Sequence, residues 1–377
     1  MAKARYLQDS DDPFIFIRKL FVDYGYSRII NSYNRFIFIF HTCSLLLEGY
    51  YIIKNFSIDF FTQYGGATNL ILYFLVTQFI VIIKQDFVHQ IVEESKSLYW
   101  SMDFLDVNKQ AQILQEMTKL KRKIYVLWMS TVIFAIMMLP VWGDYSEAHL
   151  FPQIYQTYFG NWSPIFYYFY VSTFPFAAYT GLRIAAMALY FTLIIHFQII
   201  LLNQKILQIA QERDTSQEEI AKNLRSCVCQ HVTLKRFVAK VLKSIENAVP
   251  VYFCLAILCL ITVLFVILNN LDTSTSNHLK ARFLFAGIYG TVILYTFTEA
   301  GQLLSEINDQ VFNTLMQCPW YNWNTKNKKT LMIFMLGSLK PVQIVWGGVN
   351  VDYKFGGSVI QTCCSYALVL YQMRNAK

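Results

Sequence analysis

Six histidines and eight cysteines are the side chains of this sequence best suited to catalysis or metal binding. The histidines are scattered, and none has another histidine or a carboxylate at the spacing that holds a metal ion. Cys227 and Cys229 form a C-x-C pair without a second half, which favours ordinary thiols over a zinc site. The sequence contains neither a G-x-S-x-G motif nor a P-loop. We therefore predict no enzyme, no cofactor and no metal site.

Three charged residues, Glu48, Arg183 and Glu299, fall inside strongly apolar stretches. Charges in hydrocarbon are costly and usually face a cavity or a partner. Arg183 is expected to line an aqueous vestibule or to pair with Glu48. A purely structural role for all three is the alternative. Two histidines, His41 and His196, also lie in apolar stretches, where we expect them to be buried and hydrogen-bonded.

Aromatic and methionine side chains gather in one half of several apolar stretches. A small apolar ligand needs such a cage, with a few hydroxyl or indole groups to orient it. Aromatic residues also pack in cores and form belts at membrane interfaces, so both interpretations stay open for each residue. The candidate ligand-binding residues are Tyr73, Phe74, Phe134, Met137, Met138, Trp142, Phe174, Tyr179 and Tyr289.

The composition indicates which elements must position these residues. Of the 377 residues, 55% are apolar and only 15% are charged, against about 25% charged in soluble domains. The apolar residues occur in runs long enough to cross a bilayer. We predict an all-α integral membrane protein with seven transmembrane helices. The spans lie near residues 36–53, 66–83, 124–142, 164–202, 249–268, 283–304 and 359–373.

Two of these spans are irregular. The fourth is too long for one perpendicular crossing and is expected to tilt, project or kink, most naturally at Pro175 or Gly181. Before the seventh, an apolar piece at 331–346 is interrupted by Pro341 and by Gly347 and Gly348. We expect this piece to be cytosolic or re-entrant and only the second piece to cross.

The lysines and arginines set the orientation. Of 32 such residues, 25 lie in the stretches 1–35, 84–123, 205–248 and 305–341, whereas the opposite loops are nearly free of them. This predicts a cytosolic N-terminus and, with seven spans, an extracellular C-terminus. The net charge of +8 therefore reflects topology and not nucleic-acid binding. Two N-x-Ser/Thr sequons, at Asn55 and Asn161, fall in loops placed outside and are candidate glycosylation sites.

The chain divides into consecutive regions under this topology. Residues 1–35 form a cytosolic N-terminal segment, and 36–304 hold six transmembrane helices whose outer half carries the candidate ligand site. The stretches 88–123 and 205–248 keep helical apolar spacing and are predicted to extend the spans into the cytosol. Together with 305–350 they form a cytosolic anchor region, and 351–377 form the seventh helix.

The C-terminal third resembles the insect odorant receptor family. The resemblance depends on the order and spacing of several short motifs, and the seven-span pattern accounts for the rest of the chain. One departure concerns the last helix, where residues 351–354 precede Phe355 and replace the Ser-Leu that family members often carry. The motifs are 301–306, 318–321, Lys328 with Lys329, Leu331, Pro341, Gly347 with Gly348, Ser358 with Val359, and Ser365 with Tyr366.

This resemblance implies a subunit of a heteromeric, ligand-gated, non-selective cation channel in the cell membrane of a sensory neuron. The last helix of each subunit would line a central pore, and Val369, Gln372 and Met373 match the family's gate motif. The loop at 205–248 is shorter than that of the common co-receptor. The chain therefore resembles a tuning subunit that assembles with the co-receptor, in tetramers, and binds a small volatile odorant.

Two other receptor classes are the alternatives. A gustatory receptor of the same superfamily shares the ending from Tyr366 to Gln372, but the motif at 318–321 favours the odorant branch. A G-protein-coupled receptor would have an extracellular N-terminus, Asp-Arg-Tyr after the third span and Asn-Pro-x-x-Tyr in the seventh. This sequence contains neither motif.

Overall fold

The computed structural model describes residues 12–55, 58–139, 149–211, 216–246, 248–270, 276–339, 342–346 and 348–375. Within these ranges the chain is helical, as predicted. The exceptions are turns and one two-stranded hairpin. The long helices are α2 (Arg28–Lys54), α3 (Ile58–Ile83), α5 (Val107–Met137), α8 (Phe174–Gln211), α9 (Gln217–Ile245), α10 (Ala248–Asn270), α11 (Asn277–Met316) and α13 (Tyr353–Asn375). Shorter helices are α1 (Ile15–Ile17), α4 (Gln85–Ser97), α6 (Phe151–Phe159), α7 (Ser163–Ser172) and α12 (Thr325–Ser338). The hairpin pairs β1 (Val345–Trp346) with β2 (Val349–Asn350).

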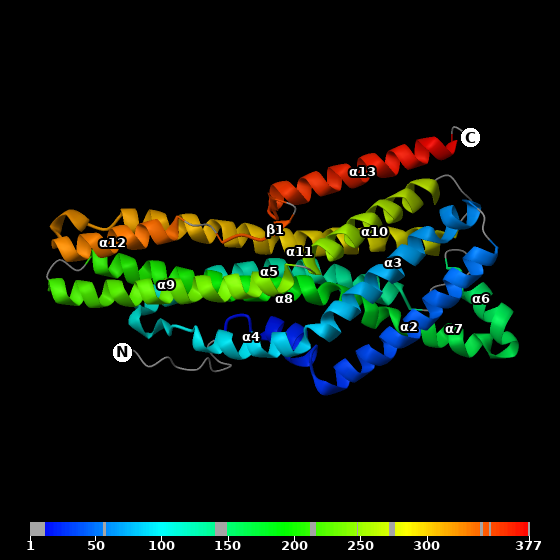
Figure 1. The fold of residues 1–377 in the computed structure, drawn as a ribbon, viewed down its shortest axis with the longest axis horizontal. Helices are drawn as coiled ribbons and strands as arrows, with labels where there is room; N and C mark the ends of the chain where they lie inside the picture. Colours follow the sequence, from blue (N-terminus) through cyan, green and yellow to red (C-terminus); the bar gives the residue numbers. More distant parts are fainter. Residues whose placement is uncertain are drawn as a thin grey trace.

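The helices form an elongated bundle, with α8 and α11 packed side by side along much of its length (Figure 1). At one end, α9 and α12 extend the bundle, and at the other end lie α6 and α7. The last helix, α13, contacts α10 and α11 and then diverges from the body toward its C-terminal end. The most buried side chains lie along α8, since it is surrounded by α3, α5, α9 and α11.

Short polar side chains define where several helices begin. The hydroxyls of Ser27, Ser216 and Ser276 accept hydrogen bonds from the third backbone N–H beyond them, at the starts of α2, α9 and α11. Asn324 does the same for α12. Such caps satisfy donors that the first helical turn leaves without partners. Asp352 accepts from the Phe355 N–H at 2.9 Å, so the residues that depart from the family pattern cap α13.

Five segments among the described residues are long and apolar enough to cross a bilayer. They are Arg28–Lys54, Tyr64–Ile83, Phe151–Gln211, Val249–Asn269 and Asn277–Met316. The third and seventh predicted spans, on α5 and α13, are not among them, since both helices carry polar and charged residues. The number of seven spans and the orientation of the termini remain predictions.

The long fourth span is interrupted near one of the two predicted positions. The helix breaks at Thr173, two residues before Pro175, and separates α7 from α8. The Thr173 hydroxyl lies 2.7 Å from His41 Nε2, so His41 is the buried, hydrogen-bonded histidine that we expected. At Gly181, the other predicted position, the helix continues without a break. The absence of a side chain there allows the Tyr289 and Phe74 rings to pack closely on α8.

The stretch 88–123 was predicted to extend the spans as helices. It contains α4, a turn, and the first half of α5. The stretch 205–248 contains the end of α8 and most of α9. The N-terminal segment is also more than a cytosolic tail: a π-helical turn, Arg18–Tyr24, packs on α8, and Phe14, Ile17 and Phe21 are almost fully buried.

Hydrogen bonds hold α12 against α9. The side-chain oxygen of Gln217 accepts from the Asn324 N–H at 2.8 Å, and the Asn327 amide donates to the Gln217 carbonyl at 2.9 Å. Farther along, Lys235 donates to the Gly337 carbonyl. These contacts join the predicted anchor segments into one helical unit at one end of the bundle.

Candidate functional site

Four of the predicted aromatic residues meet around Gly181 on α8. Phe134 of α5 stacks on Tyr289 of α11 with ring centroids 4.6 Å apart, and Phe74 of α3 lies 6.4 Å from the same Tyr289 ring. Tyr73 lies next to Phe74 and reaches the Gly181 carbonyl. A side chain at position 181 would collide with this cluster, since an added Cβ would lie 2.2 Å from the Tyr289 hydroxyl. Gly181 therefore allows the four rings to close on α8.

Tyrosine hydroxyls bind the cluster to the backbone of α8. The hydroxyls of Tyr73 and Tyr252 lie 2.6 Å apart, and each donates to the Gly181 carbonyl at 3.2 Å in one of the possible proton arrangements. Tyr289 donates to the Ala178 carbonyl at 2.7 Å. Buried hydroxyls require such partners. The same groups are the polar handles that a ligand would use here.

A cavity of about 360 Å³, which we call the outer pocket, adjoins this cluster between α3, α10 and α11. The lining is aliphatic and aromatic, with two tyrosine hydroxyls and one thiol. It consists of Leu70, Tyr73, Ala256, Cys259, Leu260, Val263, Ala286, Tyr289, Gly290 and Ile293. Such a lining suits a small, mostly apolar compound.

The remaining predicted ligand residues lie elsewhere. Tyr179 turns to the opposite face of α8, where its hydroxyl donates to the Leu20 carbonyl at 2.6 Å. Phe174 lies near the outer end of α8, beside a separate small cavity that it shares with Phe74. Helical geometry explains the separation of Tyr179, because residues two apart on a helix point in different directions.

The two methionines lie at the end of α5. Met138 is buried, and the Met137 carbonyl accepts from Arg282 Nε at 3.4 Å. Neither lines the outer pocket. Trp142, the last of the predicted set, lies outside the described residues.

Sequence reasoning missed the α10 side of the pocket. Tyr252 and Cys259 both contribute to it or to its hydroxyl network, but neither was a candidate. A signal was present: Tyr252 is the one tyrosine in the strongly apolar run 249–264. Buried hydroxyls in membrane helices are often functional or structural contacts between helices.

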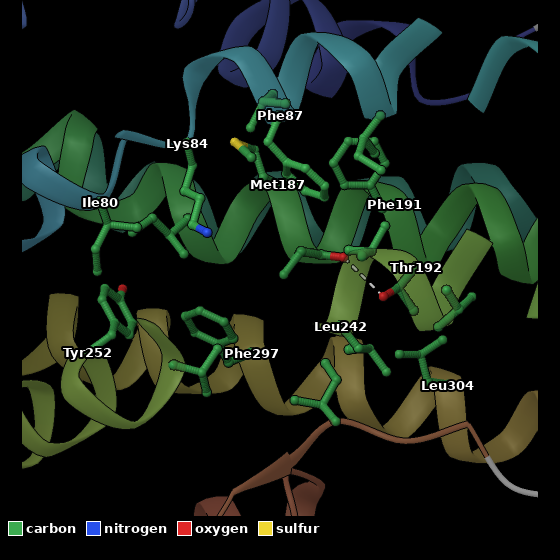
Figure 2. Close-up of a pocket in the computed structure, with 18 of the residues that line it drawn as sticks. Ile80, Lys84, Phe87, Met187, Phe191, Thr192, Leu242, Tyr252, Phe297 and Leu304 are labelled. Carbon is green, nitrogen blue, oxygen red and sulfur yellow. Dashed lines mark hydrogen bonds between the residues drawn. The ribbon is translucent and has the colours of Figure 1, made fainter. Parts of the chain in front are cut away.

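A second and larger space, which we call the inner cavity, lies toward the end of the bundle that carries the basic segments (Figure 2). It occupies about 940 Å³, including the part open to its surroundings. Its walls come from the junction of α3 with α4, from α8, from the junction of α9 with α10, and from α11. Tyr252 belongs to this wall, so one tyrosine lies between the two spaces.

The predicted Arg183–Glu48 pair does not form. Arg183 is almost fully buried on α8, with its guanidinium 4.3 Å from the centre of the Tyr26 ring and 5.9 Å from that of Tyr179. Its partners are thus aromatic faces, which attract a cation. Glu48 instead accepts a hydrogen bond from Thr68 at 2.6 Å. The two residues face different neighbours because Arg183 turns toward the N-terminal segment.

Glu299 links three elements. Its carboxylate accepts from the Tyr295 hydroxyl on α11 at 2.5 Å and from Lys123 of α5 at 3.3 Å. The Tyr353 hydroxyl, at the first residue of α13, also donates to it. Two residues farther along α11, the backbone of Val351 lies so close to Gly301 that an added Cβ would be 1.7 Å from the Val351 carbonyl oxygen. Glu299 and Gly301 therefore hold the start of α13 on α11.

The predicted gate residues lie on the part of α13 that diverges from the body. The buried side chains on α13 are those of Phe355, Val359, Cys363 and Ala367, and none of the residues described after Ala367 is buried. Val369 is 50% exposed, Met373 is 64% exposed, and Gln372 is exposed. No other element of the described chain buries these three side chains, so they lie on its surface.

The candidate glycosylation sites, Asn55 at the end of α2 and Asn161 beside α6, are both exposed.

At the end of the bundle formed by α9 and α12, burial raises the pKa of the Cys227 thiol to about 12 and that of the Cys318 thiol to about 11. Both thiols are therefore protonated at neutral pH. Burial lowers the pKa of His231, which lies against Phe334 of α12, to about 4, so this imidazole is neutral. Within the described ranges, no three His, Cys, Asp or Glu side chains gather as metal ligands would.

Comparisons with known proteins identify the fold. The sequence model of the 7tm odorant receptor family matches residues 59–363. The chain belongs to the odorant receptor family. The structure of the insect olfactory receptor OR5 from Machilis hrabei has a TM-score of 0.68 to this odorant receptor at 14% identity, covering 92% of this chain and 90% of that one. The same olfactory receptor in complex with eugenol has a TM-score of 0.70 at 14% identity, with the same coverage. No curated protein matches the sequence.

Family membership confirms several predictions from the sequence. This odorant receptor has an all-α membrane fold with several apolar helices, and it is a ligand-binding receptor rather than an enzyme. It is a multi-pass membrane protein. At 14% identity, the likeness to OR5 concerns the fold, so the roles of individual residues must be argued from their contacts in this chain.

Proposed function

We propose that this receptor is the odorant-sensing subunit of a heteromeric, ligand-gated, non-selective cation channel. A small volatile compound, apolar or aromatic, binds in the outer pocket and against the aromatic cluster around Gly181. The eugenol-bound OR5 shows that a protein of this fold can hold an aromatic compound. The aromatic outer pocket, placed within an odorant receptor fold, is the observation that carries this proposal.

The pocket is one layer of side chains away from the proposed pore helix. A smaller cavity between α10 and α11 shares Ala256, Leu260, Gly290 and Ile293 with the outer pocket, and its lining includes Val359 of α13. A ligand that moves α10 against α11 would therefore change the packing of α13. Val369 and Met373, one from each subunit, would form the hydrophobic constriction, and Gln372 would lie beside it.

The partner is the odorant co-receptor, in a tetramer whose contacts involve α12. On this helix, Leu331 and Phe334 are buried against the receptor's own helices. The exposed apolar face of α12 consists instead of Met332, Ile333, Leu336 and Leu339. Exposed apolar clusters of this kind are typical of protein–protein interfaces. We place the receptor in the membrane of a sensory neuron.

Electrophysiology with a panel of volatile compounds tests this function. Cells that express the receptor with a co-receptor should show odour-evoked inward currents, and cells that express it alone should show little. The current should persist when G-protein signalling is blocked, and a strict requirement for G proteins would refute the channel proposal.

Pocket occupancy is tested by filling the outer pocket. Ala286→Phe places a ring in the cavity and should abolish responses to ligands of the unmodified receptor, since overpacking leaves no room for them. Leu284→Phe, two residues away on the exposed face of the same helix, is the matched control and should leave responses intact. Equal responses of both variants would place the odorant elsewhere.

A further inference from the structure

The inner cavity is a second potential ligand site, separate from the outer pocket. The Tyr73–Tyr252 hydroxyl pair and the Gly181 carbonyl lie between the two spaces, since Tyr73 lines the outer pocket and Tyr252 lines the inner cavity. A compound in one space therefore does not occupy the other while this pair remains closed. The inner cavity is also the larger of the two.

The lining of the inner cavity combines a long apolar surface with one charge. Its apolar side chains include Phe87, Met187, Phe191, Leu242 and Phe297. Lys84 is the one ionic residue among the described residues that line it. The hydroxyl groups of the lining have partners within the protein: Thr192 donates to the Ala188 carbonyl at 2.9 Å, and Tyr252 pairs with Tyr73. Such a surface fits a molecule with a hydrocarbon body and a single anionic group.

Lys84 is positioned for the charged end of such a molecule. It is the turn residue between α3 and α4, and its side chain extends toward the cavity beside Met187 (Figure 2). This turn, like the start of α10, lies at the end of the apolar spans where the chain becomes polar. An ammonium group at the boundary of the hydrocarbon can meet an anionic headgroup while the chain of the ligand stays in apolar surroundings.

We propose that the inner cavity binds an amphiphile with one acyl chain and an anionic headgroup. The headgroup contacts Lys84, and the acyl chain lies along Phe191, Leu242 and Phe297. Two sources supply this chemistry: a free fatty acid, with a carboxylate, and a lysophospholipid, with a phosphate. The binding does not depend on the odorant proposal, because the cavity and its lining are separate from the outer pocket.

Occupancy of the inner cavity would act on the start of α13. Phe297 and Leu304 of the cavity wall flank Glu299 and Gly301 on α11, and Ile344 of the wall precedes the hairpin that leads to α13. The Val351 N–H donates to the Ile344 carbonyl at 2.9 Å. A bound acyl chain would press on both attachments of α13, so it would adjust the channel's response to odorant without replacing the odorant.

Photolabelling of the purified full-length receptor in lipid nanodiscs tests the site. The probe is palmitic acid with a photoreactive diazirine at the end of the chain, and labelled peptides are mapped by mass spectrometry. Labels should fall on the cavity-lining stretches of α8, α10 and α11, and excess oleate should compete with the probe. Labels confined to lipid-facing residues of α3 or α10 would overturn the site.

The competing compounds test the headgroup. Oleate or oleoyl lysophosphatidic acid should displace the probe, whereas oleyl alcohol should need about tenfold higher concentrations, since a charged hydrogen bond is lost. The more potent of the two anions identifies the source of the ligand. Equal potency of oleyl alcohol would overturn the anionic assignment.

Variants at two walls test the residues. Lys84→Gln should weaken oleate competition about tenfold, Lys84→Arg should preserve it, and the exposed Lys326→Gln should have no effect. Ala188→Leu narrows the cavity from the opposite wall and should reduce labelling in a protein whose elution profile is unchanged. Full labelling of both Lys84→Gln and Ala188→Leu would overturn the proposal.

Discussion

At the scale of single residues, Gly181 controls whether the aromatic cluster can close. An alanine Cβ there would lie 2.2 Å from the Tyr289 hydroxyl and 3.0 Å from Phe74 Cε1, so both rings must shift. Overpacking of this kind costs about 1–3 kcal/mol. We predict that Gly181→Ala raises the half-maximal odorant concentration by about tenfold or more, measured as current in cells with the co-receptor.

Gly287→Ala is the control for this prediction. Its Cβ would meet Ile267 and Val263 at 3.5 and 3.7 Å, which are ordinary contacts. The dose–response curve of this variant should match that of the unmodified receptor. An unchanged curve for Gly181→Ala would show that the rings around Tyr289 do not contact the odorant.

Glu299 is the residue through which we expect α13 to be coupled to the bundle. Glu299→Gln removes the charge that faces Lys123, and Tyr353→Phe removes the hydroxyl donor from α13. The main effect of each variant should be a lower maximal odorant-evoked current, with a smaller change in the half-maximal odorant concentration. In the double variant the effects should not add, because both changes break the same contact.

Additive effects of Glu299→Gln and Tyr353→Phe would contradict a shared contact. Tyr321→Phe, at an exposed tyrosine near α12, is the control and should change neither quantity. Surface labelling should confirm that all variants reach the membrane in equal amounts.

The sequence predicted the chemical types at the site better than their directions. Tyr73, Phe74, Phe134 and Tyr289 meet in the structure, but Tyr179 of the same predicted set packs on the N-terminal segment. Composition shows that aromatic residues gather at one depth, whereas the face that each occupies depends on how α8 is rotated in the bundle. A helix that is apolar on all sides, such as α8, gives no periodic signal for that rotation.

At the scale of elements, α12 shows how an apolar helix divides its faces. Leu331 and Phe334 are buried, while Met332, Ile333 and Leu336 remain 64%, 67% and 59% exposed. We predict that Met332→Ser with Leu336→Ser lowers the yield of assembled channel at least tenfold, because the apolar contact between subunits is lost. Co-purification with a tagged co-receptor and native gel electrophoresis measure this yield.

The matched control for the α12 variants is Lys326→Ser, at an exposed polar position of the same helix. It should assemble normally. If the double variant also assembles normally, the contact between subunits lies on another element.

Elements without periodicity were the ones that the sequence could not predict. The N-terminal π-helical turn, Arg18–Tyr24, is short, and its burial depends on α8, which is distant in sequence. The helix α6, nine residues in what was expected to be an external loop, packs on α7 and on α2, and α2 is distant from it in sequence. The residues 351–354, which depart from the family pattern, did not define the beginning of α13, although the Asp352 cap there is a known signal for a helix start.

At the scale of the whole molecule, charge and shape agree on two distinct ends. The two sequon asparagines lie near the α2–α3 and α6–α7 loops at one end, and the basic helices α9 and α12 extend the opposite end (Figure 1). Because the positive end should remain in the cytosol, we predict a cytosolic N-terminus and an extracellular C-terminus.

Epitope tags at the two ends measure this orientation. In unpermeabilised cells an antibody should stain the C-terminal tag and not the N-terminal tag, and permeabilisation should reveal both. Asn161→Gln and Asn55→Gln should each leave this pattern unchanged, and any size shift on glycosidase treatment should be lost with the sequon that carries the glycan. An N-terminal tag that stains in intact cells would reverse the orientation, and the outer pocket would then open toward the cytosol, where an airborne odorant arrives last.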